Sequence, residues 1–143
     1  MFLLYGVRRS SIMAWRCQGR NAVTIAYWIV AGLLGLFYLY AGGKKVVQSK
    51  ERLAPMMGWV DTVPMPMVRA IGVMEVLGAA GLVLPPLTGI LPGLALAAAI
   101  GFTVLQVLAT GLHLSRGEVR ETGLNVTLIV LAAVEVWLAT IWW

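Results

Sequence analysis

Long stretches without a charged side chain constrain this chain more than any other feature of its sequence. Residues 21–43 form one uncharged run of 23 residues, and residues 76–115 form another of 40. A helix of about 20 apolar residues is long enough to cross the hydrocarbon core of a bilayer. Only 12% of the 143 residues are charged and 60% are hydrophobic, whereas about 25% of residues are charged in soluble domains. The sequence therefore predicts a polytopic membrane protein with one domain.

Glycines, prolines and short polar segments divide the apolar sequence into four parts. Gly42 and Gly43, followed by two lysines, are expected to end the first span, because glycine favours helix ends and lysine reaches the headgroups. Pro85 and Pro86 are expected to break the longest uncharged run between the second and third spans. We predict an all-α fold, a bundle of four transmembrane helices within residues 22–143. The spans are expected at about residues 22–42, 66–84, 89–111 and 123–142.

Residues 1–21 are expected to form a basic tail outside the bundle. The tail contains four of the eleven basic residues and no acidic one, and a basic segment beside a membrane helix is attracted to anionic lipid. The apolar run that follows is longer than the core of a secretory signal, so we predict an uncleaved first span. Both Met1 and Met13 remain open as the start of the chain. Nucleic-acid binding is not expected, because the sequence contains no basic face with an ordered reading element.

Four spans place both termini on one side of the membrane and the polar loops, residues 46–65 and 112–122, on the other. The tail carries four basic residues, while the loops and their flanks carry seven. Basic residues concentrate in cytoplasmic loops. We therefore expect a multi-pass protein of the cell membrane with cytoplasmic loops and external termini.

The chain has a single cysteine, Cys17, and a single histidine, His113. One thiol excludes an internal disulfide and a CxxC redox pair, and one histidine excludes multi-histidine zinc sites and a bis-histidine haem. A serine hydrolase triad would have to use His113 and Asp61, and no nucleophile motif accompanies them. We therefore expect no metal site, assign no catalytic residue and give Cys17 no role.

Each predicted span places a polar side chain in the half of the bundle next to the two polar loops. Glu75 lies roughly 13 Å from that face, and a carboxylate at this depth must pair, meet water or hold a proton. It is interpreted either as a proton-handling or ligand-anchoring group, or as a staple bonded to a tyrosine, asparagine or lysine of another helix. His113, at the mouth of the bundle, is either a proton donor to a quinone headgroup or a partner of the helix dipole. The candidate ligand-binding residues are Tyr38, Tyr40, Lys44, Lys45, Glu75, Gln106 and Asn125.

Two further features of the spans are interpreted as structural. Glu135 lies roughly 18 Å from the face with the polar loops, at the depth of Tyr27 and Trp28, and we expect a tyrosine hydroxyl or an indole N–H to hydrogen-bond it. Small residues allow membrane helices to approach closely. Close packing of the second span is therefore expected at Gly72, Gly78 and Gly81.

Two segments of the chain resemble the DoxX and DoxX-like membrane protein family. They are LFYLYAGGKKV at residues 36–46 and GVMEVLGAAGLVLPPLTG at residues 72–89, and the resemblance extends over about residues 23–140. The resemblance implies a compact bundle of four membrane helices. Some members of this family are subunits of thiosulfate:quinone oxidoreductase, and others are associated with membrane redox or stress-response assemblies. A thiol-based reaction is not expected here, because the spans contain no cysteine. The family motif falls on Gly72, Glu75 and Gly78, and on Lys44 or Lys45.

Three functions remain open for such a chain. The first is an accessory membrane component that binds a partner, a lipid or a quinone in the mouth around Glu75. The second is a membrane subunit of a quinone-linked oxidoreductase of the thiosulfate:quinone type, with Glu75 or His113 handling protons. The third is a small transporter or proton path working as an oligomer. We favour the first, because no catalytic motif is present and fold alone does not define function. The candidate cofactor is then a membrane quinone. The candidate partners, besides the lipid bilayer, are a redox protein or a second copy of this chain.

Overall fold

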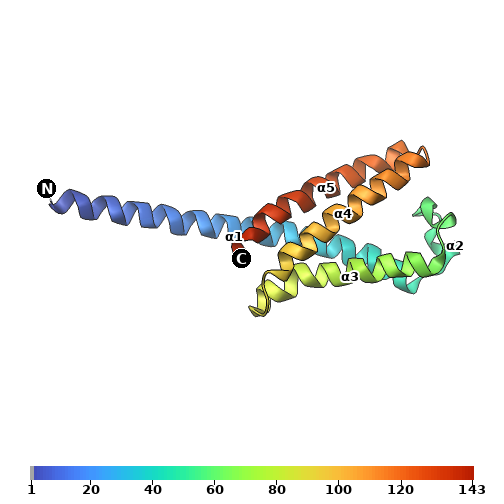
Figure 1. Cartoon of the computed structure of the whole chain (residues 1–143), viewed down its shortest axis with the longest axis horizontal. Helices are drawn as coiled ribbons and strands as arrows, with labels where there is room; N and C mark the ends of the chain where they lie inside the picture. Colours follow the sequence, from blue (N-terminus) through green and yellow to red (C-terminus); the bar gives the residue numbers. More distant parts are fainter. Residues whose placement is uncertain (1) are drawn as a thin grey trace.

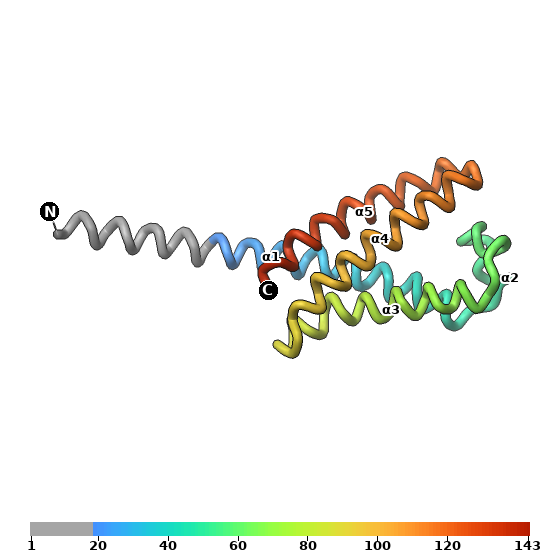
Figure 2. Tube along the Cα trace, viewed as in Figure 1, coloured from blue at the N-terminus to red at the C-terminus, as the bar shows by residue number. Residues whose placement is uncertain are grey.

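The computed structural model describes residues 19–143, and over these residues the chain is helical and contains no strand (Figure 1, Figure 2). Residues 1–18 of the predicted tail, including Cys17, lie outside the described part of the chain. The elements in order are α1 (Phe2–Val47), α2 (Lys50–Leu53), the 3₁₀ helix η1 (Gly58–Asp61), α3 (Met65–Thr88), α4 (Leu94–Ser115), α5 (Val119–Ala139) and the 3₁₀ helix η2 (Thr140–Trp142).

Four of these helices are long and apolar enough to cross a membrane, which confirms the predicted fold class. Their outward surface is rich in large hydrophobic side chains, with Leu36 70% and Leu77 65% exposed. Lipid is the solvent for such side chains in a membrane bundle. The four spanning segments are Gly19–Val47, Met65–Thr88, Leu94–Ser115 and Val119–Trp142.

The helices form two antiparallel pairs, α1 with α3 and α4 with α5 (Figure 1). The connection that carries α2 and η1 lies at the same end of the molecule as the turn between α4 and α5, whereas the turn between α3 and α4 lies at the opposite end. We call the first end, formed by residues 48–64 and 116–118, the mouth. All polar connections therefore gather at one end of the bundle.

One helical face of each span forms the core. On α1 the buried residues recur at intervals of four, three and four, as expected for one face of a helix, and alanines on α4 and α5 keep the helices close. A second, smaller cluster of Leu53, Val60 and Val68 fixes α2 and η1 against α3. The main core consists of Tyr27, Ala31, Leu34, Tyr38, Ala79, Leu82, Ala95, Ala99, Phe102, Leu128, Ala132, Leu138 and Ala139.

Helix α1 does not end at Gly42 and Gly43, as the sequence suggested, but continues to Val47. Gly42 serves a different purpose, because α1 and α3 touch there through their backbones. A Cβ on Gly42 would lie 2.7 Å from the carbonyl oxygen of Gly72, and a Cβ on Gly72 would lie 2.8 Å from that of Gly42. The glycine therefore permits a helix crossing and not a helix end. The close packing predicted for the second span is also present at Gly78, which lies against the ring of Phe102.

The double proline does not end α3, which continues from Met65 to Thr88 and stops at Gly89 in the left-handed conformation, with φ of 70°. Proline lacks the N–H that would bond the carbonyl four residues earlier, so Pro86 leaves the carbonyl of Leu82 without its helical donor. The hydroxyl of Tyr27, on α1, donates a hydrogen bond to that carbonyl. Neighbouring helices commonly satisfy backbone groups that a membrane proline frees, and the helix therefore persists.

The polar segments contain more helix than the sequence indicated. Helix α4 begins at Leu94, after Pro92 and Gly93, and runs past His113 to Ser115, while α5 already begins at Val119. A charged residue ends a membrane span but need not end a helix, because the helix is formed by backbone hydrogen bonds between residues four apart. The turn between α4 and α5 is consequently reduced to residues 116–118.

Candidate functional site

A buried ion pair joins α1 to α3 in the half of the bundle next to the mouth. Lys45 Nζ lies 2.6 Å from both carboxylate oxygens of Glu75, and the two side chains are only 8% and 5% exposed. Each partner lies three residues from the glycine of its own helix at the crossing of Gly42 and Gly72. The backbone contact thus brings the charges together, and the opposite charges neutralise one another away from water. Glu75 is therefore bonded to a lysine of another helix.

Of the two adjacent lysines, only Lys45 enters the bundle. Lys44 Nζ lies 4.4 Å from the ring centroid of Tyr40 and 3.3 Å from the Sδ atom of Met56. Tyr40 itself is 60% exposed. Two of the candidate residues, Tyr40 and Lys44, therefore lie on the outer surface and not with the buried polar side chains.

A second polar contact joins α1 to α4. Gln106 Nε2 donates a 2.8 Å hydrogen bond to the hydroxyl of Tyr38, whose ring stacks on Phe102 with centroids 3.7 Å apart. Asn125, on α5, is also buried. Within the described part of the chain, Gln106 Oε1 and Asn125 Nδ2 have no hydrogen-bond partner. The structure thus leaves one acceptor and one donor unused beneath the mouth.

A group of hydrogen-bonded polar side chains lies at the mouth, and we call it the polar clasp; it consists of His113, Arg116, Glu118 and Thr62. Glu118 accepts from Arg116 Nε at 2.7 Å, and its other oxygen lies 2.7 Å from His113 Nδ1. The hydrogen bonds from Arg116 and His113 hold the pKa of Glu118 below its usual value of 4.5. Arg116 also donates to the hydroxyl of Thr62 at 2.7 Å. The clasp therefore ties the α4–α5 turn to the segment that follows η1.

The clasp positions an aromatic residue over the ion pair. Arg116 donates at 3.2 Å to the carbonyl of Gly58, the first residue of η1. The next residue, Trp59, has its ring centroid 5.8 Å from Lys45 Nζ, within range of a cation–π interaction. Sequence reasoning missed Trp59, Arg116 and Glu118. The sequence signal for Arg116 and Glu118 was a base and an acid on either side of a glycine at the expected end of a span. In the structure that glycine, Gly117, has a φ of 72° and reverses the chain between α4 and α5.

Comparison with protein families assigns most of the bundle to one family. The model of the DoxX-like family matches residues 29–135. The chain belongs to the DoxX-like family. The match covers most of the four spans and includes Lys45, Glu75, Gln106 and Asn125. No curated protein and no solved structure matches the chain.

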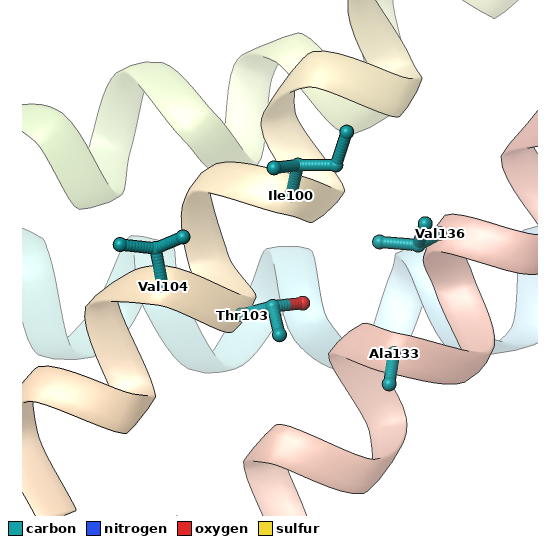
Figure 3. Close-up of a pocket in the computed structure, with 5 residues that line it drawn as sticks. All are labelled: Ile100, Thr103, Val104, Ala133 and Val136. Atoms are coloured by element: carbon teal, nitrogen blue, oxygen red, sulfur yellow. The ribbon is translucent and has the colours of Figure 1, made fainter.

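The DoxX-like bundle also has a groove of about 260 Å³ between α4 and α5, lined by apolar side chains and one threonine (Figure 3). Thr103 Oγ1 donates to the carbonyl of Ala99 on its own helix. The groove therefore offers no unused side-chain hydrogen-bond donor and differs from the polar region beneath the mouth. Its lining residues are Ile100, Thr103, Val104, Ala133 and Val136.

The structure brings most of the predicted site residues of this DoxX-like protein into one half of the bundle. His113 lies apart from them, in the clasp with Glu118. Over residues 19–143, no group of three histidine, cysteine or acidic side chains could hold a metal ion. Five of the predicted site residues are buried in that half, namely Tyr38, Lys45, Glu75, Gln106 and Asn125.

The hydrogen bond expected at Glu135 is not formed among the described residues. The side chain is fully buried, but among the described residues neither of its oxygens has a hydrogen-bond partner. The hydroxyl of Tyr27, the expected donor, is bonded to the carbonyl of Leu82. Pro86 leaves the carbonyl of Leu82 without its helical donor, and the Tyr27 hydroxyl takes that place. Its only proton is therefore not available to Glu135.

Proposed function

We propose that this DoxX-like protein is a membrane component that binds the hydroxyl-bearing headgroup of a membrane-soluble molecule beneath its mouth. The observation that carries the proposal is the pair of unused groups, Gln106 Oε1 and Asn125 Nδ2. Buried polar groups without partners are costly, particularly where no bulk water reaches them. One hydroxyl can donate to the amide oxygen and accept from the amide nitrogen at the same time. A quinol and a lipid headgroup both supply this chemistry.

Lys45 and Glu75 have a positioning role in this proposal. Both oxygens of Glu75 already accept from Lys45, so the carboxylate has its counter-charge within the bundle. The pair instead fixes α1 against α3 and holds Tyr38 towards Gln106 on α4. Trp59, whose ring centroid lies 5.8 Å from Lys45 Nζ, adds a cation–π contact to the pair on the side of η1.

The location of the mouth suggests the leaflet from which the ligand enters. Seven of the eleven basic residues belong to the mouth end of the chain, either in its connections or in the adjoining helix ends, and the other four lie within residues 1–20. Because cytoplasmic loops are rich in lysine and arginine, we place the mouth on the cytoplasmic side of the cell membrane. A headgroup from the inner leaflet then has the shortest route to Gln106 and Asn125.

Thermal unfolding of the purified protein in detergent, with a short-chain quinol or phosphatidylglycerol added, tests the proposal. A ligand that binds only the folded state raises the Tm, by an amount equivalent to about 2.7 kcal/mol at a concentration 100 times its Kd. We expect one of the two probes to raise the Tm of the wild type and not that of Gln106→Leu or Asn125→Leu. Thr103→Val, which removes a hydroxyl from the apolar groove, is the matched control and should respond as the wild type does.

The two probes distinguish the sources of the hydroxyl. A response to the quinol alone identifies a quinone-type ligand, and a response to phosphatidylglycerol alone identifies a lipid headgroup. A wild type that responds to neither probe, or leucine variants that respond as strongly as the wild type, would overturn the proposal.

A further inference from the structure

Glu135 forms a second buried polar position, towards the end of the bundle opposite the mouth. It lies on α5 between the core residues Ala132 and Leu138 and is 0% exposed. Within residues 19–143 neither carboxyl oxygen has a hydrogen-bond partner. The same is true of the indole Nε1 of Trp142, which lies two turns further along the chain. Two of the unpartnered buried side chains therefore belong to this end of the molecule.

The surroundings of Glu135 contain no described base that could neutralise it. Of the buried side chains that α1, α4 and α5 contribute to this half of the core, Tyr27 is the only titratable one apart from Glu135 itself. Its hydroxyl donates to the carbonyl of Leu82, and its ring packs edge-on against Trp28 and Trp142. Arg20, the described base nearest to Tyr27 along α1, is exposed.

An ionised carboxylate in such a place would be expensive. Burial of a bare charge costs far more than burial of a neutral polar group, and an acid in this position avoids the cost by keeping its proton. We propose that Glu135 is a proton-binding site inside the membrane, where a neutral carboxylic acid with unused hydrogen-bonding capacity faces the Tyr27 and Trp142 end of the core. The ligand of this site is the proton itself, which needs no cavity.

The two intramembrane glutamates then differ in charge state because their neighbours differ. Glu75 has the ammonium of Lys45 at 2.6 Å from each oxygen, whereas Glu135 has no described cation. Apolar residues separate the two positions along α1, where the buried Ala31 and Leu34 lie between Tyr27 and Tyr38. Glu135 is therefore independent of the ligand site proposed beneath the mouth, and either proposal can fail alone.

Infrared spectroscopy of the full chain at neutral pH, in a detergent without ester or acid groups, tests this assignment. A protonated carboxylic acid has a C=O stretch that is separate from the bands of carboxylates and amides. The chain has six acidic residues, and the four besides Glu75 and Glu135 lie at the mouth end, outside or at the ends of the spans. We expect one acid band in the wild type, which is lost in Glu135→Gln, is retained in Glu75→Gln and shifts in ²H₂O.

Glu135→Asp keeps the test valid if the glutamine variant does not fold, because it retains an acid at the same position. The aspartate variant should keep the band at a changed frequency. The assignment is overturned if the wild type lacks the band, if the band persists unchanged in Glu135→Gln or Glu135→Asp, or if it disappears in Glu75→Gln.

Discussion

At the scale of single residues, helical phase decides what Lys44 and Lys45 do. Both lysines lie at the depth where a partner for Glu75 is expected, but only Lys45 stands on the face of α1 that contains Gly42. The next residue along a helix is rotated by about 100°, and Lys44 accordingly lies over Tyr40 on the outer surface. Sequence could predict the depth of these side chains but not the face, because the helix crossing that sets the face is a long-range contact.

Replacement of one partner should show that the Lys45–Glu75 pair is ionised. Glu75→Gln leaves the ammonium of Lys45 buried without a counter-charge, and breaking a buried pair in this way costs about 3–5 kcal/mol. We expect a clear fall of the Tm in detergent, whereas Lys44→Gln should leave it unchanged. Replacement of both partners, Lys45→Met with Glu75→Leu, should recover most of the loss. Equal Tm values for the wild type and Glu75→Gln from mildly acidic to mildly alkaline pH would contradict an ion pair.

Glu118 should make the clasp sensitive to acid. Its pKa is lowered in the folded protein by hydrogen bonds from Arg116 and His113, so its stabilising contribution is present above its unfolded value of 4.5 and is lost as the pH falls through the lower folded value. Glu118→Gln should therefore unfold with a weaker dependence of the Tm on pH in this acidic window. Glu121→Gln, one turn further along α5, is the matched control and should keep the wild-type dependence. Identical pH profiles for the wild type and Glu118→Gln would show that the clasp does not cause the dependence of the Tm on acidic pH.

At the scale of helices, the four spans were predictable and their ends were not. Apolar length alone identifies each span, but Gly42 and Pro86, which suggested helix ends, lie within helices. In each case a neighbouring helix decides the outcome, since α3 packs on Gly42 and Tyr27 satisfies the carbonyl that Pro86 frees. Local sequence carries no information about such a neighbour.

The hydrogen bond from the Tyr27 hydroxyl to the Leu82 carbonyl should stabilise the fold only while Pro86 is present. Tyr27→Phe removes the donor, and a net loss of about 0.5–1.5 kcal/mol of unfolding free energy is expected for one hydrogen bond. In a Pro86→Ala background the backbone N–H returns, and Tyr27→Phe should then cost much less. A double-mutant cycle, measured by denaturation in detergent, gives this coupling directly. Tyr40→Phe, at an exposed tyrosine of the same helix, controls for loss of a hydroxyl. Equal costs of Tyr27→Phe in both backgrounds would show that the tyrosine does not replace the helical donor.

At the scale of the whole molecule, the fold class and the DoxX-like family follow from the sequence, and the site follows only in part. Depth along the spans is a property of the sequence, and it suffices to place Glu75, Gln106 and Asn125 in one half of the bundle. The clasp and Trp59 were missed, because they depend on how two connections far apart in the chain meet at the mouth. The unused groups of Gln106, Asn125 and Glu135 could not be predicted either, since a missing partner is a property of the packed bundle.

Native mass spectrometry of the protein, gently extracted from its own membrane, tests the central claim of a headgroup site beneath the mouth most directly. The wild type and the Thr103→Val control should carry a bound quinol or lipid that is absent from a Gln106→Leu, Asn125→Leu double variant. A wild type without any bound molecule, or a double variant that retains the same molecule, would contradict the claim and leave the polar residues with a purely structural role.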